Sequence, residues 1–407
     1  MNKVAIIGGG AAGLMAALTA AKSGADVTVY EHNKRVGKKI LASGNGRCNI
    51  INTTAFVDDY FGADPGFAAF CLDRMPFASF EKFCQSIGLL LDVKEDGRCY
   101  PLSNEARSVV LAFKSAVEEA GVKIYTERRV SDIAKEGKRF VIRSGQEQEA
   151  FDKVLIATGS EAAPQLGATA DGYDFAKTFG HTIEPPYPSL VQLHIDSSIH
   201  HKMAGVKTVA EVTLYLNGRP EEKIAGDILF TNYGISGLAI LDISQKASSA
   251  LMDYQQVTVG INLLPRFSRQ ALGSVLERLF ASVPNHPLET VLSGVISIKI
   301  VPYLLQSAHI DPCLPASKLG TKEIKKLAHQ IQDWRFEISG THGFKHAEVS
   351  GGGVSTLQIE SRTMESKLVK GLYFAGEVID IVGRRGGYNF NFAWASGMIA
   401  GEQLAKV

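Results

Sequence analysis

Short, nearly continuous apolar runs open the chain. Val4–Ile7 and Val27–Tyr30 are rich in β-branched residues, and an alanine-rich helical segment, Leu14–Ser23, separates them. Strands covered on both faces of a parallel sheet show such continuous runs, whereas half-exposed strands alternate. We therefore predict a compact βαβ unit at the beginning of the chain.

Segments with the hydrophobic period of a helix then alternate with segments that have the period of a strand. Residues 36–52 are an exception, because they are rich in Gly, Lys and Asn and lack a period, which indicates a functional loop. Alternating runs around the turn Asn217-Gly218 are typical of a hairpin. Helices are expected over 67–88, 104–120, 268–280, 321–333 and 391–405, and in part over 288–305. Strands are expected over 123–125, 130–134, 140–143, 153–157, 191–194, 209–216, 223–224 and 371–375.

A strand, a Gly-rich loop and a helix return at the C-terminus. This order predicts the α/β fold class, with a Rossmann-type dinucleotide domain built from both chain ends. We assign residues 1–190 and 345–407 to this domain, 191–261 and 336–344 to an inserted β-barrel domain, and 262–335 to a helical insertion.

Composition narrows the classes of protein. Of the 407 residues, 45% are hydrophobic and 21% charged, which is typical of a folded protein. The 43 Lys and Arg nearly balance the 42 Asp and Glu, so we expect no nucleic-acid partner, although a local patch can lie within a neutral total. The five cysteines form no C-x-x-C pair and favour a reduced, cytoplasmic setting.

We expect no membrane span and no metal site. The histidines are interpreted as surface or core residues, and the adjacent pair His200-His201 would point opposite ways on a strand. The others considered for a metal are His194, His342 and His346.

The strongest local motif is GGGAAG at residues 8–13, between the first predicted strand and helix. Gly8 permits a tight turn, Gly10 lets a pyrophosphate approach the backbone, and Gly13 lets the helix pack on the strand. The helix that follows begins at Ala11 and Ala12, where free N–H groups attract an anion. Glu31, at the end of the next strand, is placed to bind ribose hydroxyls.

This motif alone allows NAD(H) about as well as FAD. Two distant segments favour FAD, because a flavin that spans the domain needs contacts from both chain ends. Thr158 and Gly159 end a strand far from the motif, and Gly376, Glu377 and Asp380 end another near the C-terminus. No second G-x-G-x-x-G lies between a strand and a helix, so we expect no separate NAD(P)H domain.

Two further segments carry candidate chemistry. Residues 38–49 combine flexible glycines with amides, a guanidinium and a thiol, and the loop before the last helix again offers a donor-rich helix start. Cys48 has no neighbouring cysteine in the sequence and is interpreted as a packed thiol. Arg47, Arg384 and Tyr388 are candidates for lining the flavin, and the sequence identifies no catalytic residue.

Several of these motifs together resemble a known family. The segments are ASGNGRCN (42–49), DILFTNYGISG (227–237), AEVSGGG (347–353), TMESKLVKGLYFAGEVID (363–380) and GGYNF (386–390). They resemble the aminoacetone-oxidase-like FAD-binding enzymes, also called NAD(P)/FAD-dependent oxidoreductases. The resemblance implies a two-part FAD domain, an inserted β-barrel and a helical domain.

The resemblance also implies a set of FAD contacts. Carried over by motif, they are Ala12, Glu31, Lys38, Asn45, Gly46, Val130, Thr158, Gly159, Gly376, Glu377, Asn389, Phe390 and Asn391. This chain departs from the family in three places. It has Asn232 where relatives usually have His, and Leu238 where they usually have Pro. It also has two arginines before Gly386, where relatives often carry a small or hydroxyl residue in place of one of them. If these loops form the flavin face, we expect the substrate preference of this chain to differ from that of relatives.

The sequence thus predicts an FAD-dependent oxidoreductase that acts by flavin hydride transfer on a small molecule. Two modes stay open: a small-amine (aminoacetone-like) oxidase that uses O2, and a reductase that takes hydride from NAD(P)H and reduces an unsaturated substrate. A flavin-dependent tRNA-modifying enzyme is the alternative from another class.

Overall fold

A computed structural model describes residues 1–197 and 199–406. The chain forms two compact units, Met1–Pro188 with Glu348–Val407, and Ser189–Ala347. Each unit buries its own hydrophobic core. The division of the second unit into a barrel and a helical domain, with the boundaries given above, stays a prediction.

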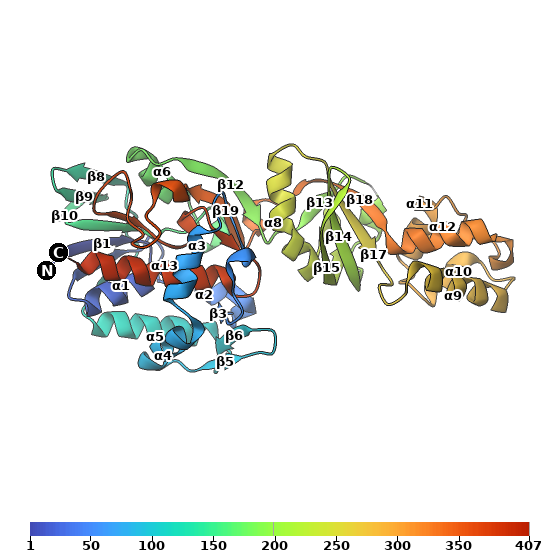
Figure 1. Cartoon of the computed structure of the whole chain (residues 1–407), viewed down its shortest axis with the longest axis horizontal. Helices are drawn as coiled ribbons and strands as arrows, with labels where there is room; N and C mark the ends of the chain where they lie inside the picture. The colour runs from blue at the N-terminus through green and yellow to red at the C-terminus, as the bar shows by residue number, and fades with distance from the viewer. Residues whose placement is uncertain (198, 407) are drawn as a thin grey trace. The chain divides into compact units, whose positions relative to one another are not determined.

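The first unit is organised around a five-stranded parallel sheet in the order β20-β11-β1-β2-β7 (Figure 1). Its central strands are almost fully buried, as their continuous apolar runs predict. The C-terminal β20 completes the sheet beside β11, which confirms a Rossmann domain built from both chain ends. The strands are β1 (Lys3–Ile7), β2 (Asp26–Tyr30), β7 (Lys123–Tyr125), β11 (Lys153–Ile156) and β20 (Leu372–Phe374).

Helices α1 (Ala11–Lys22) and α13 (Tyr388–Ala405) lie side by side in this unit (Figure 1). Two glycines of α13 allow the close approach. A Cβ on Gly397 would overlap the carbonyl oxygen of Ala12, and one on Gly401 would lie 2.6 Å from that of Ala16. The helix that follows the glycine motif is thus packed against the last helix of the chain.

Smaller sheets and helices surround this core. The sheets are β10-β9-β8 (Glu147–Phe151, Arg139–Ser144, Asp132–Glu136), β3-β6-β5 (Ile51–Asn52, Arg98–Pro101, Leu91–Val93), β12-β19 (Ile183–Ser189, Val349–Val354) and β21-β4 (Val382–Gly383, Tyr60–Phe61). The helices are α2 (Lys38–Ala42), α3 (Phe67–Arg74), α4 (Phe77–Ser86), α5 (Ala106–Glu119) and α6 (Asp171–Thr178), with the 3-10 helices η1 (Ser43–Gly46), η2 (Val57–Asp59), η3 (Pro164–Leu166), η6 (Thr356–Gln358) and η7 (Gly376–Val378).

Three predicted elements need correction here. The helix expected over 67–88 is divided, because Pro76 cannot continue α3 and instead precedes the first residue of α4. The loop expected over 36–52 holds α2 and η1. Helix α13 begins at Tyr388, three residues earlier than expected, after Gly387 in a left-handed conformation (φ 100°).

The second unit contains a closed barrel in the order β13-β16-β15-β14-β17-β18. Its hairpin turns at Asn217-Gly218, as predicted, with φ values of 50° and 77°. Helix α8 (Leu238–Met252) packs on the barrel and was not expected from the sequence. The strands are β13 (Leu193–Ile195), β14 (Lys207–Leu216), β15 (Arg219–Phe230), β16 (Gly234–Ser236), β17 (Val257–Asn262) and β18 (Trp334–Thr341).

Helices fill the segment between β17 and β18. Helix α12 packs against α9 and α11, and its residues Ile324, Leu327 and Ile331 are buried, as its amphipathic pattern predicts. The helices of this unit are α7 (Ile199–Lys202), α9 (Arg269–Ser282), α10 (Leu288–Ser293), α11 (Val301–Ser307) and α12 (Thr321–Gln332), with η4 (Ala316–Lys318) and η5 (Phe344–His346).

Candidate cofactor site

The glycine motif forms the turn between β1 and α1, and its three glycines meet different surroundings. A Cβ on Gly8 or Gly13 would overlap a backbone carbonyl oxygen, that of Ala157 or of Gly8. A Cβ on Gly10 would meet nothing within 4 Å. Two glycines are therefore needed for packing, while Gly10 leaves an open approach to the backbone.

Glu31 is buried at the end of β2 beside this turn. The Oε2 of Glu31 accepts the N–H of Gly9 at 2.9 Å. The Oε1 of Glu31 accepts two hydrogen bonds from Asn33, one from its backbone N–H at 2.7 Å and one from its side-chain Nδ2 at 2.8 Å. These bonds hold the carboxylate in place. Each oxygen has two lone-pair directions, so the Oε2 side in particular retains acceptor capacity for a ribose hydroxyl.

Two helices begin at this part of the unit without a cap. Neither α1 nor α13 has a side chain that accepts from its first turn, and neither first turn contains an acidic residue. No capping side chain or carboxylate of the first turn therefore offsets the partial positive charge that attracts an anionic ligand to these helix starts. Gly376 holds η7 against α1, because a Cβ there would lie 2.8 Å from that of Ala12, and its N–H donates to Ser396 Oγ at 3.0 Å.

The end of β11 lies against the same turn. The N–H of Ala157 donates to the carbonyl of Ile7 at 2.9 Å. Thr158 packs against Gly172, whose missing side chain leaves room for Oγ1. Gly159 has a φ of 77° and open space where a Cβ would stand.

Glu377 links three segments. Its Oε2 lies 2.6 Å from Lys39 Nζ, and its Oε1 accepts Ser160 Oγ–H at 2.7 Å and the N–H of Ser350 at 2.9 Å. The predicted cofactor contact of its carboxylate stays untested, but this side chain ties α2, the end of β11 and β19 together. Lys39, Ser160 and Ser350 were not singled out from the sequence, because nothing local signals that they share one partner.

Asp380 is also buried, and its Oδ2 accepts the N–H of Ala63 at 2.8 Å. Burial raises the pKa of its carboxyl group, while the hydrogen bonds from Ala63 and Gly352 oppose that rise. Gly62 packs directly on the Asp380 backbone. The side chain thus holds the loop before α3.

The loop over residues 38–49 is open to solvent at its tip. Asn45 and Gly46 are exposed and left-handed, with φ values of 56° and 81°. Exposed Arg47 donates to the carbonyl of Gly44 at 3.2 Å, and its guanidinium lies over Tyr100. Lys38 Nζ lies 3.3 Å from Oδ1 of Asn33, which is itself a neighbour of Glu31.

Cys48, at the end of this loop, is fully buried. Burial raises the pKa of its thiol to about 12, so the reactive thiolate is not formed near neutral pH. The contacts favour the interpretation of a packed thiol over redox chemistry.

The loop before α13 is held by Asn389. Its Oδ1 accepts the N–H of Gly383 at 2.8 Å, and its Nδ2 donates to the carbonyl of Gly383 at 2.9 Å. Arg384 lies 3.4 Å from Asp59, and Tyr388 packs edge-on against Tyr60. Of the three candidates for lining the flavin, Arg384 thus lies on this loop and Tyr388 is the first residue of α13, whereas Arg47 lies on the loop over residues 38–49.

The first turns of α13 combine an aromatic stack with an unpaired amide. Phe390 stacks on Trp394 at 5.8 Å between ring centroids, and Trp394 Nε1 donates to the carbonyl of Ile50 at 2.8 Å. Asn391 is buried, and its Oδ1 has no hydrogen-bond partner among residues 1–197 and 199–406. A buried amide oxygen without a partner costs stability unless a ligand satisfies it.

Val130 is buried just before β8. It lies in the segment in which Arg128 donates its N–H to the carbonyl of Glu31 at 2.9 Å. This segment therefore lies beside the candidate ribose-binding carboxylate, where the resemblance implies an adenine contact.

The residues of the first unit fit an FAD molecule. The open approach at Gly10, the starts of α1 and α13 without a capping side chain, and the Oδ1 of Asn391 without a partner among the described residues suit a ligand with a pyrophosphate and polar groups at a distance from it. The individual contacts predicted from the sequence stay predictions.

A second group of polar side chains lies within the second unit. His194 Nε2 lies 2.9 Å from His342 Nδ1, and Tyr233 stacks on His342 at 3.9 Å between centroids. His200 and His201 lie in α7 with ring centroids 4.2 Å apart, so the expectation that they point opposite ways on a strand was wrong. Among the described residues, no group of three or more His, Cys, Asp or Glu is arranged to hold a metal ion.

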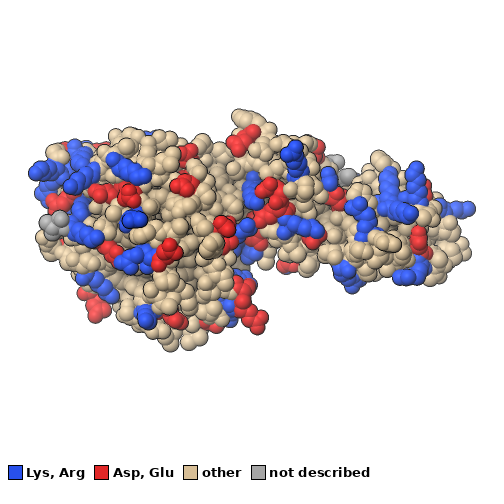
Figure 2. Space-filling model, in the orientation of Figure 1, with Lys and Arg blue, Asp and Glu red and all other residues tan. Residues whose placement is uncertain are grey.

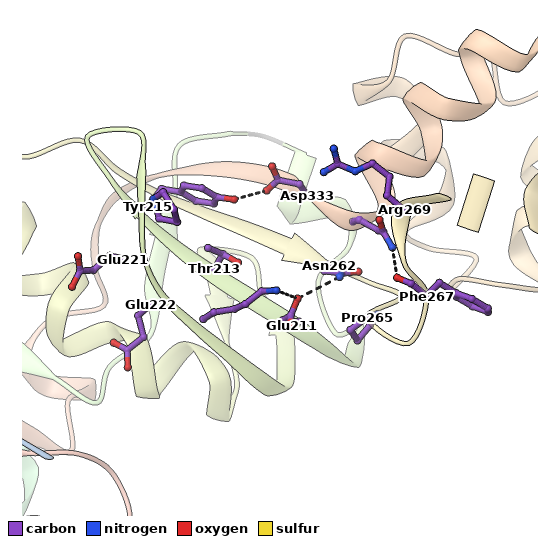
Figure 3. Close-up of a pocket in the computed structure, with 13 residues that line it drawn as sticks. Glu211, Thr213, Tyr215, Glu221, Glu222, Asn262, Pro265, Phe267, Arg269 and Asp333 are labelled. Atoms are coloured by element: carbon purple, nitrogen blue, oxygen red, sulfur yellow. Dashed lines mark hydrogen bonds and ion pairs between the residues drawn. The ribbon is translucent and has the colours of Figure 1, made fainter. Parts of the chain in front are cut away.

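The second unit also has an open pocket of about 710 Å³, between the β14–β15 hairpin and the start of the helical segment (Figure 3). Its carboxylates already have partners. Glu211 lies 2.7 Å from Lys223 Nζ, and Asp333 accepts the Tyr215 hydroxyl at 3.2 Å (Figure 3). The pocket is polar, and we assign it no role.

The fold and this site define the class of protein, an FAD-binding oxidoreductase of the Rossmann type. The chain belongs to the family described as HI0933-like protein Rossmann domain, which matches residues 2–403. No helix among residues 1–197 and 199–406 is long and apolar enough to cross a membrane.

Relatives of the chain match along its whole length. It is 36% identical to a 3-dehydro-bile acid delta(4,6)-reductase of Clostridium scindens over 408 residues, which is 100% of both chains. It is 34% identical to a ribosomal RNA dihydrouridine synthase of Haemophilus influenzae, over 98% of both chains. It is 32% identical to the Escherichia coli protein of the same name, over 98% of this chain and 97% of the other.

Among solved structures, a 3-ketosteroid delta1-dehydrogenase from Sterolibacterium denitrificans has a TM-score of 0.52 at 12% identity, and all of both chains is covered. At this identity the likeness concerns the fold alone.

Proposed function

We propose that this FAD-dependent oxidoreductase reduces a carbon–carbon double bond conjugated to a carbonyl group, with NAD(P)H as the hydride source. The observation that carries the proposal is the full-length similarity to three proteins whose names describe such reductions. In the first name, "3-dehydro" denotes a carbonyl and "delta(4,6)" denotes double bonds conjugated to it. Dihydrouridine is uridine with two hydrogens added to a ring double bond conjugated to a carbonyl.

The reaction balances without a further oxidant. NAD(P)H and a proton are consumed, NAD(P)+ is released, and each carbon of the double bond gains one hydrogen. Bound FAD supplies the hydride-transfer chemistry. Because the sequence shows only one G-x-G-x-x-G between a strand and a helix, we infer that NAD(P)H binds transiently and leaves before the unsaturated substrate enters.

The chain's own residues contribute orientation and electrostatics. The uncapped N-terminus of α13 carries partial positive charge, which stabilises negative charge on a group bound there. Glu377, with Lys39 and Ser160, holds the walls of the site at a fixed spacing. Arg384, on the loop before α13, and Tyr388, the first residue of α13, are candidates for contacting the substrate.

A small-amine oxidase was the other mode left open by the sequence. None of the three relatives described above is named as an amine oxidase, so the comparisons favour the reductase mode. The two modes differ in the donor that reduces the flavin and in the acceptor that reoxidises it.

The test follows the visible flavin absorbance of the purified protein under anaerobic conditions. We expect NADH or NADPH to bleach it within seconds and a steroid 4-en-3-one to restore it. The saturated 3-ketone should not restore it, and this comparison is the control for the double bond. Bleaching by aminoacetone but by neither nicotinamide would contradict the proposal and favour the oxidase.

A further inference from the structure

Charge is divided unevenly within the second unit. The helical insertion, residues 262–335, contains nine Lys and Arg against five Asp and Glu, a formal charge of +4. The rest of the unit, residues 189–261 and 336–347, contains six Lys and Arg against eight Asp and Glu, a formal charge of −2. On the visible side of the α9–α12 region, Lys and Arg predominate over Asp and Glu (Figure 2). The near-neutral total of the chain therefore conceals a positive segment.

The lysines of the two segments also differ in their partners. In the rest of the unit, Lys207, Lys223 and Lys246 each lie within 3.0 Å of a carboxylate oxygen, whereas Lys202 lies over the Tyr303 ring and forms no ion pair with a described residue. None of the insertion's five lysines forms an ion pair with another residue that the structure describes; they are Lys299, Lys318, Lys322, Lys325 and Lys326. Their charge is therefore not neutralised within the unit.

Three of these lysines share one face of α12. Lys322, Lys325 and Lys326 are exposed at positions i, i+3 and i+4, opposite the buried residues of the helix. The nearest carboxylate in the sequence is that of Glu323, whose Oε2 is turned back to the start of the helix, beside Gly320. We call Lys322, Lys325 and Lys326 the α12 lysine face.

We propose that the α12 lysine face docks the phosphate backbone of an RNA. Unneutralised cations at about one-turn spacing suit a polyanion, which releases bound counterions when lysines contact its phosphates. An anionic membrane fits less well, because α12 exposes no large apolar side chain among its described residues, as interfacial helices do. The inference rests on the proposed function in one respect: the uracil ring of RNA holds a double bond conjugated to a carbonyl.

The test measures binding of the holoprotein to a fluorescein-labelled single-stranded RNA by anisotropy over a series of KCl concentrations. Each lost phosphate contact lowers the slope of log K against log salt by about 0.7, so the variant K322Q/K325Q/K326Q should lower it by about 2. At 0.1 M salt, binding should weaken about 10- to 100-fold. The matched control is K22Q/K82Q/K138Q, which removes three exposed lysines of the first unit that form no ion pair with described residues.

Three outcomes would overturn the inference: no salt-dependent RNA binding by the unaltered protein, an equal loss in the control variant, or binding of phosphatidylserine vesicles in place of RNA. None of them bears on the proposed function, because flavin bleaching by NAD(P)H and reoxidation by the enone are measured without RNA. If instead RNA binds through the α12 lysine face but no enone reoxidises the flavin, the docking surface stands and the proposed function fails.

Discussion

Two carboxylates of the first unit, Glu31 and Glu377, show how similar residues take different tasks. Glu31 is held by backbone and amide N–H groups and forms no ion pair with a Lys or Arg among the described residues, and Nδ1 of His32 lies 3.5 Å from its Oε1. Glu377 lies 2.6 Å from a lysine and accepts two further hydrogen bonds. Glu31 therefore keeps acceptor capacity for a ligand, whereas Glu377 uses most of its capacity to join three segments.

Gly10 offers a direct test of the cofactor site. Its backbone has a φ of −82°, and a Cβ there meets nothing, so Gly10→Val should leave the fold intact. The valine would occupy the space that a pyrophosphate needs, and FAD binding should weaken about 10- to 100-fold. Flavin retained after purification and the Kd for added FAD measure the effect.

The matched control is Gly340→Val, which adds the same side chain to open space in the second unit. It should bind FAD as the unaltered protein does. Equal flavin content in the Gly10→Val variant would show that the pyrophosphate does not approach this turn.

His181 makes the stability of the first unit depend on pH. It is buried, its Nε2 lies 2.7 Å from Ser366 Oγ, and its Nδ1 has no partner among the described residues. Burial lowers its pKa from 6.5 to about 4. Between these two pH values His181 is therefore protonated in the unfolded chain and mostly neutral in the folded protein. The contribution of His181 to the free energy of unfolding is fully present above pH 6.5 and decreases, by at most about 3 kcal/mol, as the pH falls to 4.

Urea unfolding at about pH 7, 6, 5 and 4 tests this prediction, with His181→Gln as the variant that cannot gain the charge. The free energy of unfolding of the unaltered protein should fall more steeply than that of the variant once the pH is below 6.5. Exposed His286→Gln serves as the control. Parallel profiles for the unaltered protein and His181→Gln would refute the assignment.

At the scale of elements, the pairing of α1 with α13 carries the site. One helix follows the glycine motif and the other follows the loop at 383–387, so the packing of the two helices fixes the distance between two helix starts that have no capping side chain. Gly401 permits the contact, because a Cβ there would meet the backbone of Ala16 and the side chain of Thr19. The close packing of α13 on α1 therefore requires glycine at positions 397 and 401 of the last helix.

Gly401→Ala should push these helices apart and destabilise the protein by about 1–3 kcal/mol, since the Cβ would lie 2.6 Å from a backbone oxygen. Gly273→Ala in α9 meets open space and should be neutral or stabilise by up to about 1 kcal/mol. Urea unfolding compares the two. Equal stabilities would show that α1 and α13 are not closely packed.

At the scale of the whole molecule, the chain consists of one unit made from both ends and one made from a single continuous stretch. The second unit, Ser189–Ala347, has a closed barrel and a hydrophobic core of its own. The cofactor residues predicted from the sequence all lie in the first unit. The predicted cofactor contacts are thus confined to the first unit, and the positive segment lies in the second.

Residues 189–347 expressed alone should fold cooperatively and bind no FAD, because their core and barrel are complete without the first unit. Far-UV circular dichroism with a single sigmoidal melting transition, and flavin content after mixing with FAD, test this. A broad, non-cooperative melt would show that the barrel depends on the first unit for its stability.

Much of the fold was predictable, because local periodicity and turn chemistry act over a few residues. The βαβ unit, the Asn217-Gly218 hairpin and amphipathic α12 follow from such patterns. Helix α8 was missed because its run LAILDISQKASSALM lies among strand-like segments and begins after Gly237, without a capping side chain. The break at Pro76 was a local signal that we overlooked.

The sequence by itself determined the tight turn between β1 and α1, because the spacing of Gly8, Gly10 and Gly13 between a strand and a helix is a short-range steric requirement, and it predicts that a dinucleotide binds there. Only the tertiary structure decided that Glu377 pairs with Lys39, 338 positions away, and that Asn391 keeps a buried oxygen unpaired among the described residues. The tertiary structure also decided which lysines form ion pairs with carboxylates among the described residues. Ion pairs and unsatisfied groups depend on segments that converge from distant parts of the chain, and no local pattern encodes that convergence.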